Sequence, residues 1–378
     1  MIGVVRNLAR ADSALERLEG FRALIEERTA HQAGYPYNLD YDYAPLLPFL
    51  RYTLNNLGDP YIDGHYGIHT REFEREVLAW FADLYQLEDH WGYVTSCGTE
   101  GNLYALALAH ERFPDGILYY SADTHYSVRK AARLFRMRER IVPSQPSGEV
   151  DYEQLERALR AGRRRAAVIT VNLGTTLTGA VDRIDRISAI VDRLRISAHI
   201  HCDGALGGLL LPFMDGAPRI TFKETPIDSI AVSGHKFVGT PVPCGVVLTR
   251  RPHVRQMETA IEYIGSTDTT IMGSRNGLAV LFLWYAISER GQAFPQEVAE
   301  CVQNARYLRD QLEQLGYHPL LNDFSTTVVF DRPAAQVCQT WQLACQGERA
   351  HVVVMQNLDR ERLDRFLDEL RRSRVTDW

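Results

Sequence analysis

The sequence predicts an α/β fold in which a parallel or mixed β-sheet is covered by helices on both faces, followed by a smaller α+β unit. From about residue 91 to residue 250, short apolar segments typical of strands alternate with segments typical of helices. Such alternation indicates a sheet that is covered on both sides. Near residues 168–171 and 230–232 the strand segments are short and mostly apolar, as expected of strands whose two faces are both buried.

The chain has 378 residues, which is more than a single hydrophobic core usually supports, so we expect more than one domain. Residues 1–64 are predicted to form an N-terminal helix, up to about residue 30, and then an irregular arm with one short helix, because residues 34–63 are rich in Tyr, Pro and Asn. We expect a large domain over residues 65–290 and a small C-terminal domain over residues 291–378.

Within the large domain, a first helix is expected over residues 70–87, with Thr70 as its N-cap and an apolar stripe that contains Val77 and Phe81. The elements that follow are, in order, a strand over 91–96, a helix over 98–113, a strand over 116–122, a helix over 125–135, a strand over 166–174, a helix over 181–194 and strands over 198–205, 229–236 and 244–250. A long helical stretch is expected over about 277–315, then strands over 326–333 and 349–357 and a final helix over 359–374.

Composition and charge narrow the class of protein. The net charge of −6 gives no general attraction to nucleic acid or to an anionic membrane, and no apolar run is long enough to span a bilayer. The first twenty residues are charged and lack the apolar core of a signal peptide. The six cysteines are far apart in the chain, as is typical of reduced thiols. We therefore expect a cytoplasmic enzyme or binding protein with neither a nucleic acid nor a membrane partner.

Ligands of such sheets bind at the carboxyl ends of the strands, so the residues that follow each strand are the candidates for a site. The turn 97–102, Cys-Gly-Thr-Glu-Gly-Asn, opens a helix, and Gly98 and Thr99 offer backbone N–H groups and a hydroxyl to a phosphate. Turns of this kind also occur for purely structural reasons, and the turn is not a Walker loop because no Gly-Lys-Ser/Thr follows.

Further strand-end residues are polar or small, and each has an ordinary structural explanation when it is considered alone. They are His125, Thr175, Thr176, Asp203, Ala205, Ser233, His235 and Lys236. His199 and His201 share one face of a strand, while Cys202 points to the other. Because no third ligand follows nearby in the sequence, we expect no metal site.

Considered together, these residues suit one ligand, pyridoxal 5′-phosphate (PLP). Its phosphate needs a cup of N–H groups, its ring nitrogen needs a carboxylate, and its aldehyde needs a lysine amine of lowered pKa. The chain has only three lysines, Lys130, Lys223 and Lys236, because arginine supplies most of its positive charge. Arginine does not deprotonate in proteins, which explains why position 236 carries a lysine.

The motifs around these residues resemble those of a known family. They are "WGYVTSCGTEGN", "YYSADTHYSV", "NLGTTLTGAVD", "HCDGALGG", "SGHKFVGTPVPCGV" and "TIMGSRNG". The chain resembles the group II PLP-dependent amino acid decarboxylases, and it is most similar to plant serine decarboxylases and to histidine decarboxylases of Gram-negative bacteria. The resemblance covers about residues 34–357. It implies fold type I, which is like that of aspartate aminotransferase, with a mainly parallel sheet of seven strands.

The resemblance also implies a role for each candidate residue. Lys236 would form the Schiff base with PLP, Asp203 would pair with the ring nitrogen, Ala205 would lie against one face of the ring and His125 would stack on the other. Gly98 and Thr99 would bind the phosphate, with help from Ser233 and His235. Thr176, with Thr175, would lie near the 3′-oxygen of the cofactor or the substrate carboxylate. Lys236, His125 and Asp203 are therefore the expected catalytic residues.

The resemblance further implies a homodimer with active sites near the subunit interface. Aromatic amino acid decarboxylases carry a long mobile loop with a tyrosine, whereas the corresponding stretch 263–277 is short and has Tyr263 as its only tyrosine. The proton donor to the α-carbon is therefore open between His125, Tyr263 and a water molecule. Ser325 is a further candidate for the wall of the substrate pocket, and a strand-end hydroxyl with a structural role is an equally good explanation for it.

The expected reaction is the α-decarboxylation of an L-amino acid to CO₂ and a primary amine. Segments 65–74, 268–277, 341–347 and 351–355 resemble the plant serine enzymes, which favours conversion of L-serine to ethanolamine. The alternative is conversion of L-histidine to histamine. Two other hypotheses remain, a PLP-dependent transaminase or lyase, in which Arg332 or Arg349 would bind the substrate carboxylate, and a non-catalytic relative.

Overall fold

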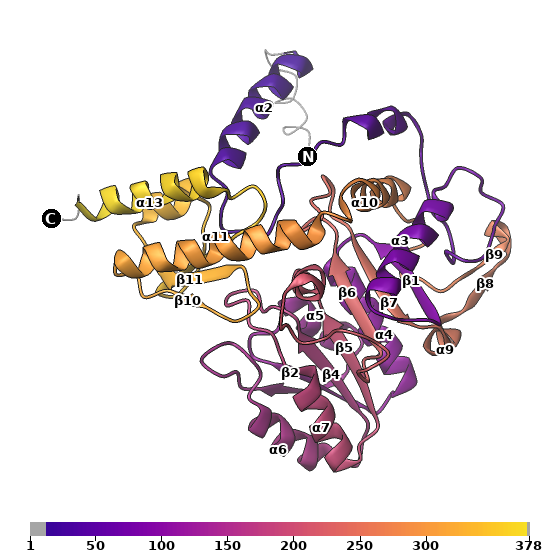
Figure 1. Cartoon of the computed structure of the whole chain (residues 1–378). Helices are drawn as coiled ribbons and strands as arrows, with labels where there is room; N and C mark the ends of the chain where they lie inside the picture. The colour runs from indigo at the N-terminus through magenta and orange to yellow at the C-terminus, as the bar shows by residue number, and fades with distance from the viewer. Residues whose placement is uncertain (1–12, 376–378) are drawn as a thin grey trace, which may run out of the picture.

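The computed structural model describes residues 13–375, and Figure 1 shows how the elements are arranged. Helix α2 (Ala14–Ala30) opens the described chain with a capping box, in which the hydroxyl of Ser13 accepts from the N–H of Glu16 and the Glu16 carboxylate accepts from the N–H of Ser13. None of its residues is buried, and it projects away from the body of the molecule. The arm that follows contains one short 3₁₀ helix, η2 (Ala44–Arg51), as expected.

A seven-stranded sheet forms the centre of the large domain, in the order β1-β7-β6-β5-β4-β2-β3. Its strands are β1 (His90–Thr95), β2 (Ile117–Ser121), β3 (Arg138–Val142), β4 (Ala167–Asn172), β5 (Ala198–Asp203), β6 (Ser229–Ser233) and β7 (Gly245–Arg250). Strand β7 is antiparallel to both of its neighbours, and the other strands run parallel to one another. The carboxyl ends of the six parallel strands therefore lie along one edge of the sheet.

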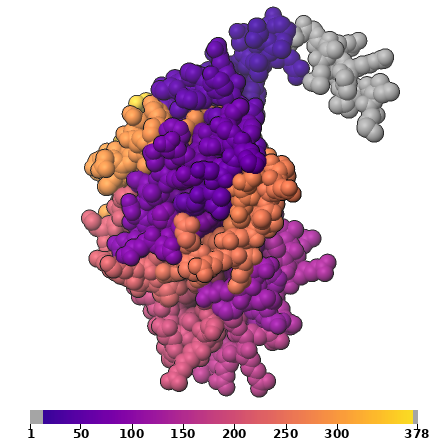
Figure 2. All heavy atoms as spheres, turned by 90° about the vertical axis from the view of Figure 1, so that its right-hand side faces the viewer, coloured from indigo at the N-terminus to yellow at the C-terminus, as the bar shows by residue number. Residues whose placement is uncertain are grey.

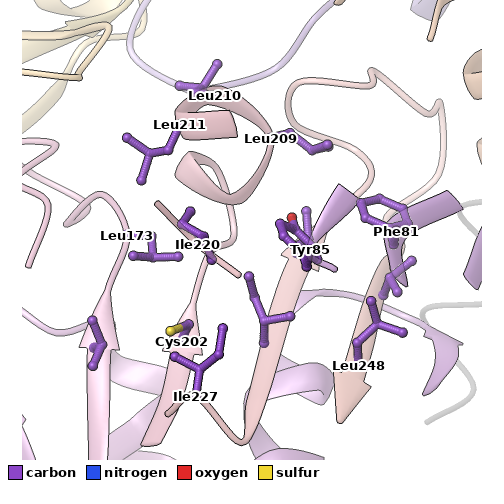
Figure 3. Packing of buried hydrophobic residues seen from close by; sticks show 14 of the residues in the cluster. Phe81, Tyr85, Leu173, Cys202, Leu209, Leu210, Leu211, Ile220, Ile227 and Leu248 are labelled. Carbon is purple, nitrogen blue, oxygen red and sulfur yellow. The ribbon is translucent and has the colours of Figure 1, made fainter. Parts of the chain in front are cut away.

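Helices cover both faces of this sheet. They are α3 (Arg71–Leu84), α4 (Gly98–Arg112), α5 (Tyr126–Leu134), α6 (Tyr152–Gly162), α7 (Ile184–Leu194), the short α8 (Gly207–Leu210) with η3 (Leu211–Phe213), and α10 (Gly277–Arg290). Side chains from α3, α7, α8 and α10 share one core with every second strand residue. Figure 3 shows part of this core, with Phe81 of α3 and Leu209 of α8 near Cys202 and Leu248 of the sheet. Residues of α4 and α5 pack against the alternate strand residues, which belong to two smaller clusters on the opposite face.

The small domain contains a four-stranded antiparallel sheet in the order β10-β11-β13-β12. Its strands are β10 (Leu320–Leu321), β11 (Thr327–Asp331), β12 (Ala344–Gln346) and β13 (Arg349–Val353), and its helices are α11 (Phe294–Gln314), α12 (Ala335–Thr340) and α13 (Arg360–Val375). A separate core lies between this sheet and the helices, and it contains Trp341, Phe330 and Phe366. The division at residues 64/65 and 290/291 fits these two cores and stays a prediction.

Several short elements lie between β7 and α10 in the sequence of the large domain. They are α9 (Arg251–Val254), η4 (Arg255–Met257), β8 (Thr259–Ile261), η5 (Glu262–Ile264) and β9 (Ser266–Asp268). Strands β8 and β9 form a two-stranded hairpin at one side of the large domain (Figure 1). Figure 2 shows that the N-terminal segment, in indigo and purple, covers much of one face of the molecule beside the orange segment that follows β7.

The structure corrects some local expectations. The stretch 277–315 is two helices rather than one, because Pro295 lies in the first turn of α11 and lacks the N–H that a continuous helix would need. Thr70 is the N-cap of α3, but its hydroxyl donates to Gly277 and Asn56 instead of capping the helix. Strand β3 and helix α6 were not expected, and β3 has exposed side chains at four of its five positions, so it lacks the apolar pattern of a buried strand. No helix in residues 13–375 is both long enough and apolar enough to cross a membrane.

Candidate functional site

The carboxyl ends of the parallel strands open into a cavity of about 370 Å³. The N-terminal arm, at residues 34–37, and the small domain, at residues 324–327 and 351–353, complete its walls. Every residue that the sequence analysis assigned to the cofactor or to the substrate of a decarboxylase, with the exception of Tyr263, lines this cavity. The packing of the parallel strands therefore gathers residues that are far apart in the chain, from Gly98 to Lys236, because each follows a strand end, and the small domain adds Ser325.

Gly98 is the first residue of α4, so its N–H and that of Thr99 belong to the first turn, whose N–H groups have no partner within the helix. A Cβ atom at position 98 would lie 2.6 Å from the Ser233 hydroxyl oxygen, so only glycine allows β6 to approach this helix end so closely. The positive end of the helix dipole points to the same place. The arrangement suits a bound phosphate.

Asp203 ends β5 and is 8% exposed. One carboxylate oxygen, Oδ1, accepts from the N–H of Ala205 at 3.2 Å, and the other, Oδ2, accepts from the side-chain amide of Asn102 at 2.7 Å. A carboxylate oxygen has a second acceptor position, so Asp203 still has capacity to accept from a protonated ring nitrogen in the cavity.

A chain of buried hydrogen bonds that the sequence analysis did not foresee supports this aspartate. The Asn102 Oδ1 lies 2.9 Å from the Nε2 of His201, whose Nδ1 lies 3.0 Å from the Ser229 hydroxyl. The same hydroxyl lies 3.1 Å from the Nε2 of His199. An amide oxygen only accepts, so His201 carries its proton on Nε2, and its Nδ1 accepts from Ser229. Burial lowers the pKa of His201 to about 4, which keeps the ring neutral.

His125 lies at the N-cap of α5. Its Nδ1 accepts from the N–H of Ser127 at 3.3 Å and lies 2.7 Å from the Ser127 hydroxyl, so the neutral ring carries its proton on Nε2. The Ser127 hydroxyl in turn accepts from Asn102 at 2.9 Å, so one amide group holds both His125 and Asp203 in place. Burial lowers the pKa of His125, with Asp203 opposing and Lys236 adding to the effect.

Lys236 follows β6, and among the described residues its amine has no hydrogen-bond or ion-pair partner. Burial lowers the pKa of this amine, and the nearby Asp203 carboxylate opposes the shift. At neutral pH a larger fraction of this amine is therefore neutral and nucleophilic than in an ordinary exposed lysine. The arm crosses directly over this residue, because the N–H of Asn38 donates to the Lys236 carbonyl at 3.1 Å. Beside it, the Nδ1 of His235 lies 2.9 Å from the carbonyl oxygen of Cys244.

The two threonines differ in what their side chains contact. The hydroxyl of Thr175 is buried, lies 2.9 Å from that of Thr178 and accepts from the N–H of Ala180, so it closes a local turn. Thr176 is exposed to the cavity and is the better placed of the two for a ligand. The Ser325 hydroxyl also lines the cavity, but it accepts from the N–H of Thr327 at 3.0 Å, as a strand-end hydroxyl does.

Tyr263 lies apart from the other candidates. It belongs to η5, between the strands of the β8–β9 hairpin, and its side chain is 84% exposed. It does not line the cavity of this chain. This separation could not be predicted from the sequence, because the hairpin is short and its orientation depends on the fold.

The structure also brings together three side chains of types that bind metals, which their spacing in the sequence did not indicate. His199, Asp228 and His253 offer ligand atoms that lie within 4.8 Å of one another. The Asp228 carboxylate is already bound by the Arg112 guanidinium at 2.8 Å. That positive charge opposes a bound cation, and we assign no metal to this group.

The cavity fits PLP by the chemistry of its donors. It offers a glycine-rich helix N-terminus for a phosphate, a carboxylate for a pyridinium nitrogen, an imidazole for a ring face and an unpartnered lysine for an aldehyde. These groups come from α4, β5, α5 and the end of β6. The fit therefore rests on residues that independent elements bring together.

Comparisons with known proteins agree with this chemistry. Residues 69–332 match the model of the pyridoxal-dependent decarboxylase conserved domain. Serine decarboxylase 1 of Oryza sativa subsp. japonica is 49% identical over 94% of this chain and 75% of its own length. Histidine decarboxylase of Solanum lycopersicum is 45% identical over 94% of this chain and 87% of its own length. Histidine decarboxylase of Pseudomonas entomophila is 39% identical over 96% of this chain and 91% of its own length.

The fold has solved relatives as well. The crystal structure of L-methionine decarboxylase from Streptomyces sp. 590 in its internal aldimine form has a TM-score of 0.88 and 26% sequence identity, over 96% of this chain and 95% of that chain. These findings confirm the fold type I architecture, the PLP cofactor and the decarboxylase family expected from the sequence. The chain belongs to the family of pyridoxal-dependent decarboxylases.

Proposed function

We propose that this PLP-dependent decarboxylase converts L-serine to ethanolamine and CO₂. The observation that carries the proposal is that Lys236, Asp203, His125 and the Gly98 turn all face one cavity of about 370 Å³. Identities of 47–49% with the three rice serine decarboxylases, against 38–45% with the histidine decarboxylases, support the same substrate.

The bound cofactor would supply the electron sink for the pair of electrons that the departing carboxylate leaves behind. Asp203 would hold the ring nitrogen protonated, and Asn102 would keep the Asp203 carboxylate in position. Lys236 would attach the cofactor through its neutral amine, and Gly98 and Thr99 would bind the phosphate, with Ser233 and His235 beside them. Ala205 lines the cavity with a small side chain and would lie against one face of the ring.

His125 would cover the other face of the ring and donate from Nε2, because its Nδ1 is already bonded to Ser127. This proton would serve either to orient the substrate carboxylate or to protonate the α-carbon after CO₂ leaves. Thr176 is the cavity hydroxyl best placed for the substrate carboxylate, and Ser325 would border the substrate side chain.

A transaminase needs a cation that clamps the substrate carboxylate, and the two arginines that could do this lie elsewhere. Arg349 forms an ion pair with Asp331 at the surface of the small domain. Arg332 is exposed and directed to the carbonyl of Gly347. None of the described residues that line the cavity is an arginine. Because no arginine among these lining residues is available to bind the substrate carboxylate, the site favours decarboxylation over transamination.

We further propose a homodimer, in which part of the pocket comes from the neighbouring chain. Large apolar side chains are exposed along α2 and the arm, namely Leu15, Leu18, Phe21, Leu47, Phe49, Leu50 and Tyr52. Exposed apolar surface of this extent is typical of a subunit interface. In such a dimer, Tyr263 would be available to the site of the neighbouring chain and not to that of its own chain.

We also propose a cytoplasmic location, which the six free thiols support.

The deciding experiment is a CO₂-release assay with added PLP on L-serine and L-histidine in parallel, with the amine identified by mass spectrometry. Ethanolamine from serine, with histidine inert, is the expected result. Histamine alone would keep the reaction and change the substrate. A keto acid without CO₂ would overturn the decarboxylase proposal in favour of transamination, and a colourless protein that does not take up PLP would indicate a non-catalytic relative.

A further inference from the structure

Two cysteines of the small domain touch each other at the surface, far along the chain from the catalytic lysine. The Sγ of Cys345 lies 3.7 Å from the Sγ of Cys338. Cys338 belongs to α12 and Cys345 to β12, and the turn between them is closed by a hydrogen bond from the N–H of Leu343 to the Cys338 carbonyl at 2.9 Å. Both are free thiols, and the fold already holds them at contact distance.

The two thiols differ in access. Cys345 is exposed, whereas Cys338 is 9% exposed and lies behind it. Burial raises the pKa of the Cys338 thiol, the contact with Cys345 adds to this effect, and Arg332 opposes it. A reagent in solution therefore meets Cys345 first, and Cys338 is placed to react with whatever Cys345 has bound.

The segment between these cysteines supports the wall of the cavity. The Trp341 carbonyl accepts from the N–H of Ala33 at 3.1 Å, and a Cβ atom at Gly34 would lie 2.2 Å from the Gln342 carbonyl oxygen. Ala344 itself lines the cavity, together with residues 34–37 of the arm. Across the sheet, Ala344 pairs with His351, whose Nε2 lies 3.1 Å from the Gly34 carbonyl. A shift of residues 341–344 therefore reaches the arm directly.

We propose that Cys338 and Cys345 form a redox-modification site. A small-molecule disulfide oxidises the two thiols to an intramolecular disulfide, and the formation of this bond moves the part of the cavity wall that the arm provides. In the first step, the thiolate of Cys345 attacks one sulfur of the disulfide, whose S–S bond breaks to release one thiolate. In the second step, the thiolate of Cys338 attacks the Sγ of Cys345 and releases the second. The protein loses two electrons, the small disulfide gains them, and the two thiol protons pass to the released thiolates.

The chemistry is tested by incubating the PLP-loaded enzyme with oxidised glutathione and following the unreduced peptides by mass spectrometry. The wild-type protein is expected to lose two hydrogen atoms in the peptide pair that contains residues 338 and 345, and dithiothreitol is expected to restore them. Cys338→Ser should stop at a glutathione adduct on Cys345, and Cys345→Ser should leave Cys338 unmodified. Cys301→Ser, which removes a buried thiol on α11, should react like the wild type. A stable wild-type adduct on Cys345, or a link between two chains, would overturn the proposal.

The coupling to the cavity wall is tested by hydrogen exchange, which needs no substrate. Oxidation is expected to weaken the hydrogen bond from Ala33 to Trp341 and to speed exchange in the peptide 31–38 by on the order of threefold, with no change in Cys345→Ser. Unchanged exchange in a fully oxidised sample would remove the coupling and leave the disulfide standing. We also expect oxidation to raise the KM for serine, an expectation that rests on the proposed function. An unchanged KM would count against that function and would leave the disulfide and the hydrogen-exchange result standing.

Discussion

The side-chain amide of Asn102 donates a hydrogen bond of 2.7 Å to the Asp203 carboxylate and another of 2.9 Å to the Ser127 hydroxyl. Because Ser127 in turn contacts His125, one amide fixes the carboxylate proposed for the ring nitrogen and the imidazole proposed for the ring face. His201 and Ser229 hold the far side of Asn102, so the amide itself cannot rotate freely. The positions of two proposed catalytic groups thus depend on a buried residue of the cavity wall.

Replacing Asn102 with Ala should therefore weaken cofactor binding. Asp203 would lose a donor, and a hydrogen bond to a charged group contributes about 1.5–3 kcal/mol, which corresponds to about a 10- to 100-fold loss of PLP affinity. PLP titration followed by absorbance measures the change. Asn304→Ala is the matched control, because it removes an amide that donates to Leu358 in the small domain. Equal PLP affinities for Asn102→Ala and the wild type would show that Asn102 does not position Asp203.

Lys236→Ala should abolish turnover, and it should also abolish the absorbance of the Schiff base between Lys236 and PLP. The variant removes the described lysine that lines the cavity, and arginine does not supply a nucleophilic amine in its place. Lys223→Ala changes an exposed lysine and should behave like the wild type. Normal turnover by Lys236→Ala with added PLP would disprove the role of this residue.

The acidic side of the pH profile should reflect His125. Burial lowers its pKa from the ordinary value of 6.5, so the ring gains its second proton at a lower pH than a free imidazole does. We expect kcat to fall with an apparent pKa below 6.5 as the pH decreases, and His125→Gln to lower kcat by about 10²- to 10⁴-fold and to remove this limb. An acidic limb that His125→Gln retains would assign the titration to another group.

Most of the central sheet could be predicted because its strands are buried on both faces and leave a clear apolar pattern. Strand β3 could not, because it lies at the edge of the sheet and exposes residues such as Arg138 and Glu139. The break before α11 was visible in the sequence as Gly291 and Pro295, but the apolar residues on either side outweighed it.

The site shows a similar division. Residues such as Lys236 and Asp203 could be named because they follow strands and because the motifs resemble those of a family. Asn102 was present in the quoted turn, but a side chain that acts through another residue leaves no local pattern, and its partner Asp203 is 101 positions away. Tyr263 is the opposite case. It was a candidate proton donor because it is a tyrosine in the stretch 263–277, yet in the folded chain it lies outside the cavity.

The last prediction concerns stability, and it compares a buried ion pair with an exposed one. Glu74 of α3 is fully buried and pairs with Arg275, accepts from the N–H of Val94 at 2.9 Å and accepts from Asn56 at 2.8 Å. These bonds tie α3 to β1, to the arm and to the segment before α10. Glu74→Gln would leave the Arg275 guanidinium buried without a counter-charge, so we expect a loss of about 3–5 kcal/mol in the free energy of unfolding.

Denaturant unfolding of the PLP-loaded protein, followed by circular dichroism, measures this loss. The matched variant is Glu153→Gln, which breaks the exposed pair with Arg157 on α6 and should leave the transition midpoint unchanged. A midpoint for Glu74→Gln that coincides with that of Glu153→Gln would mean that the buried pair adds no net stability. In that case, the packing of α3 against α10, rather than the ion pair, would hold these two helices of the large domain together.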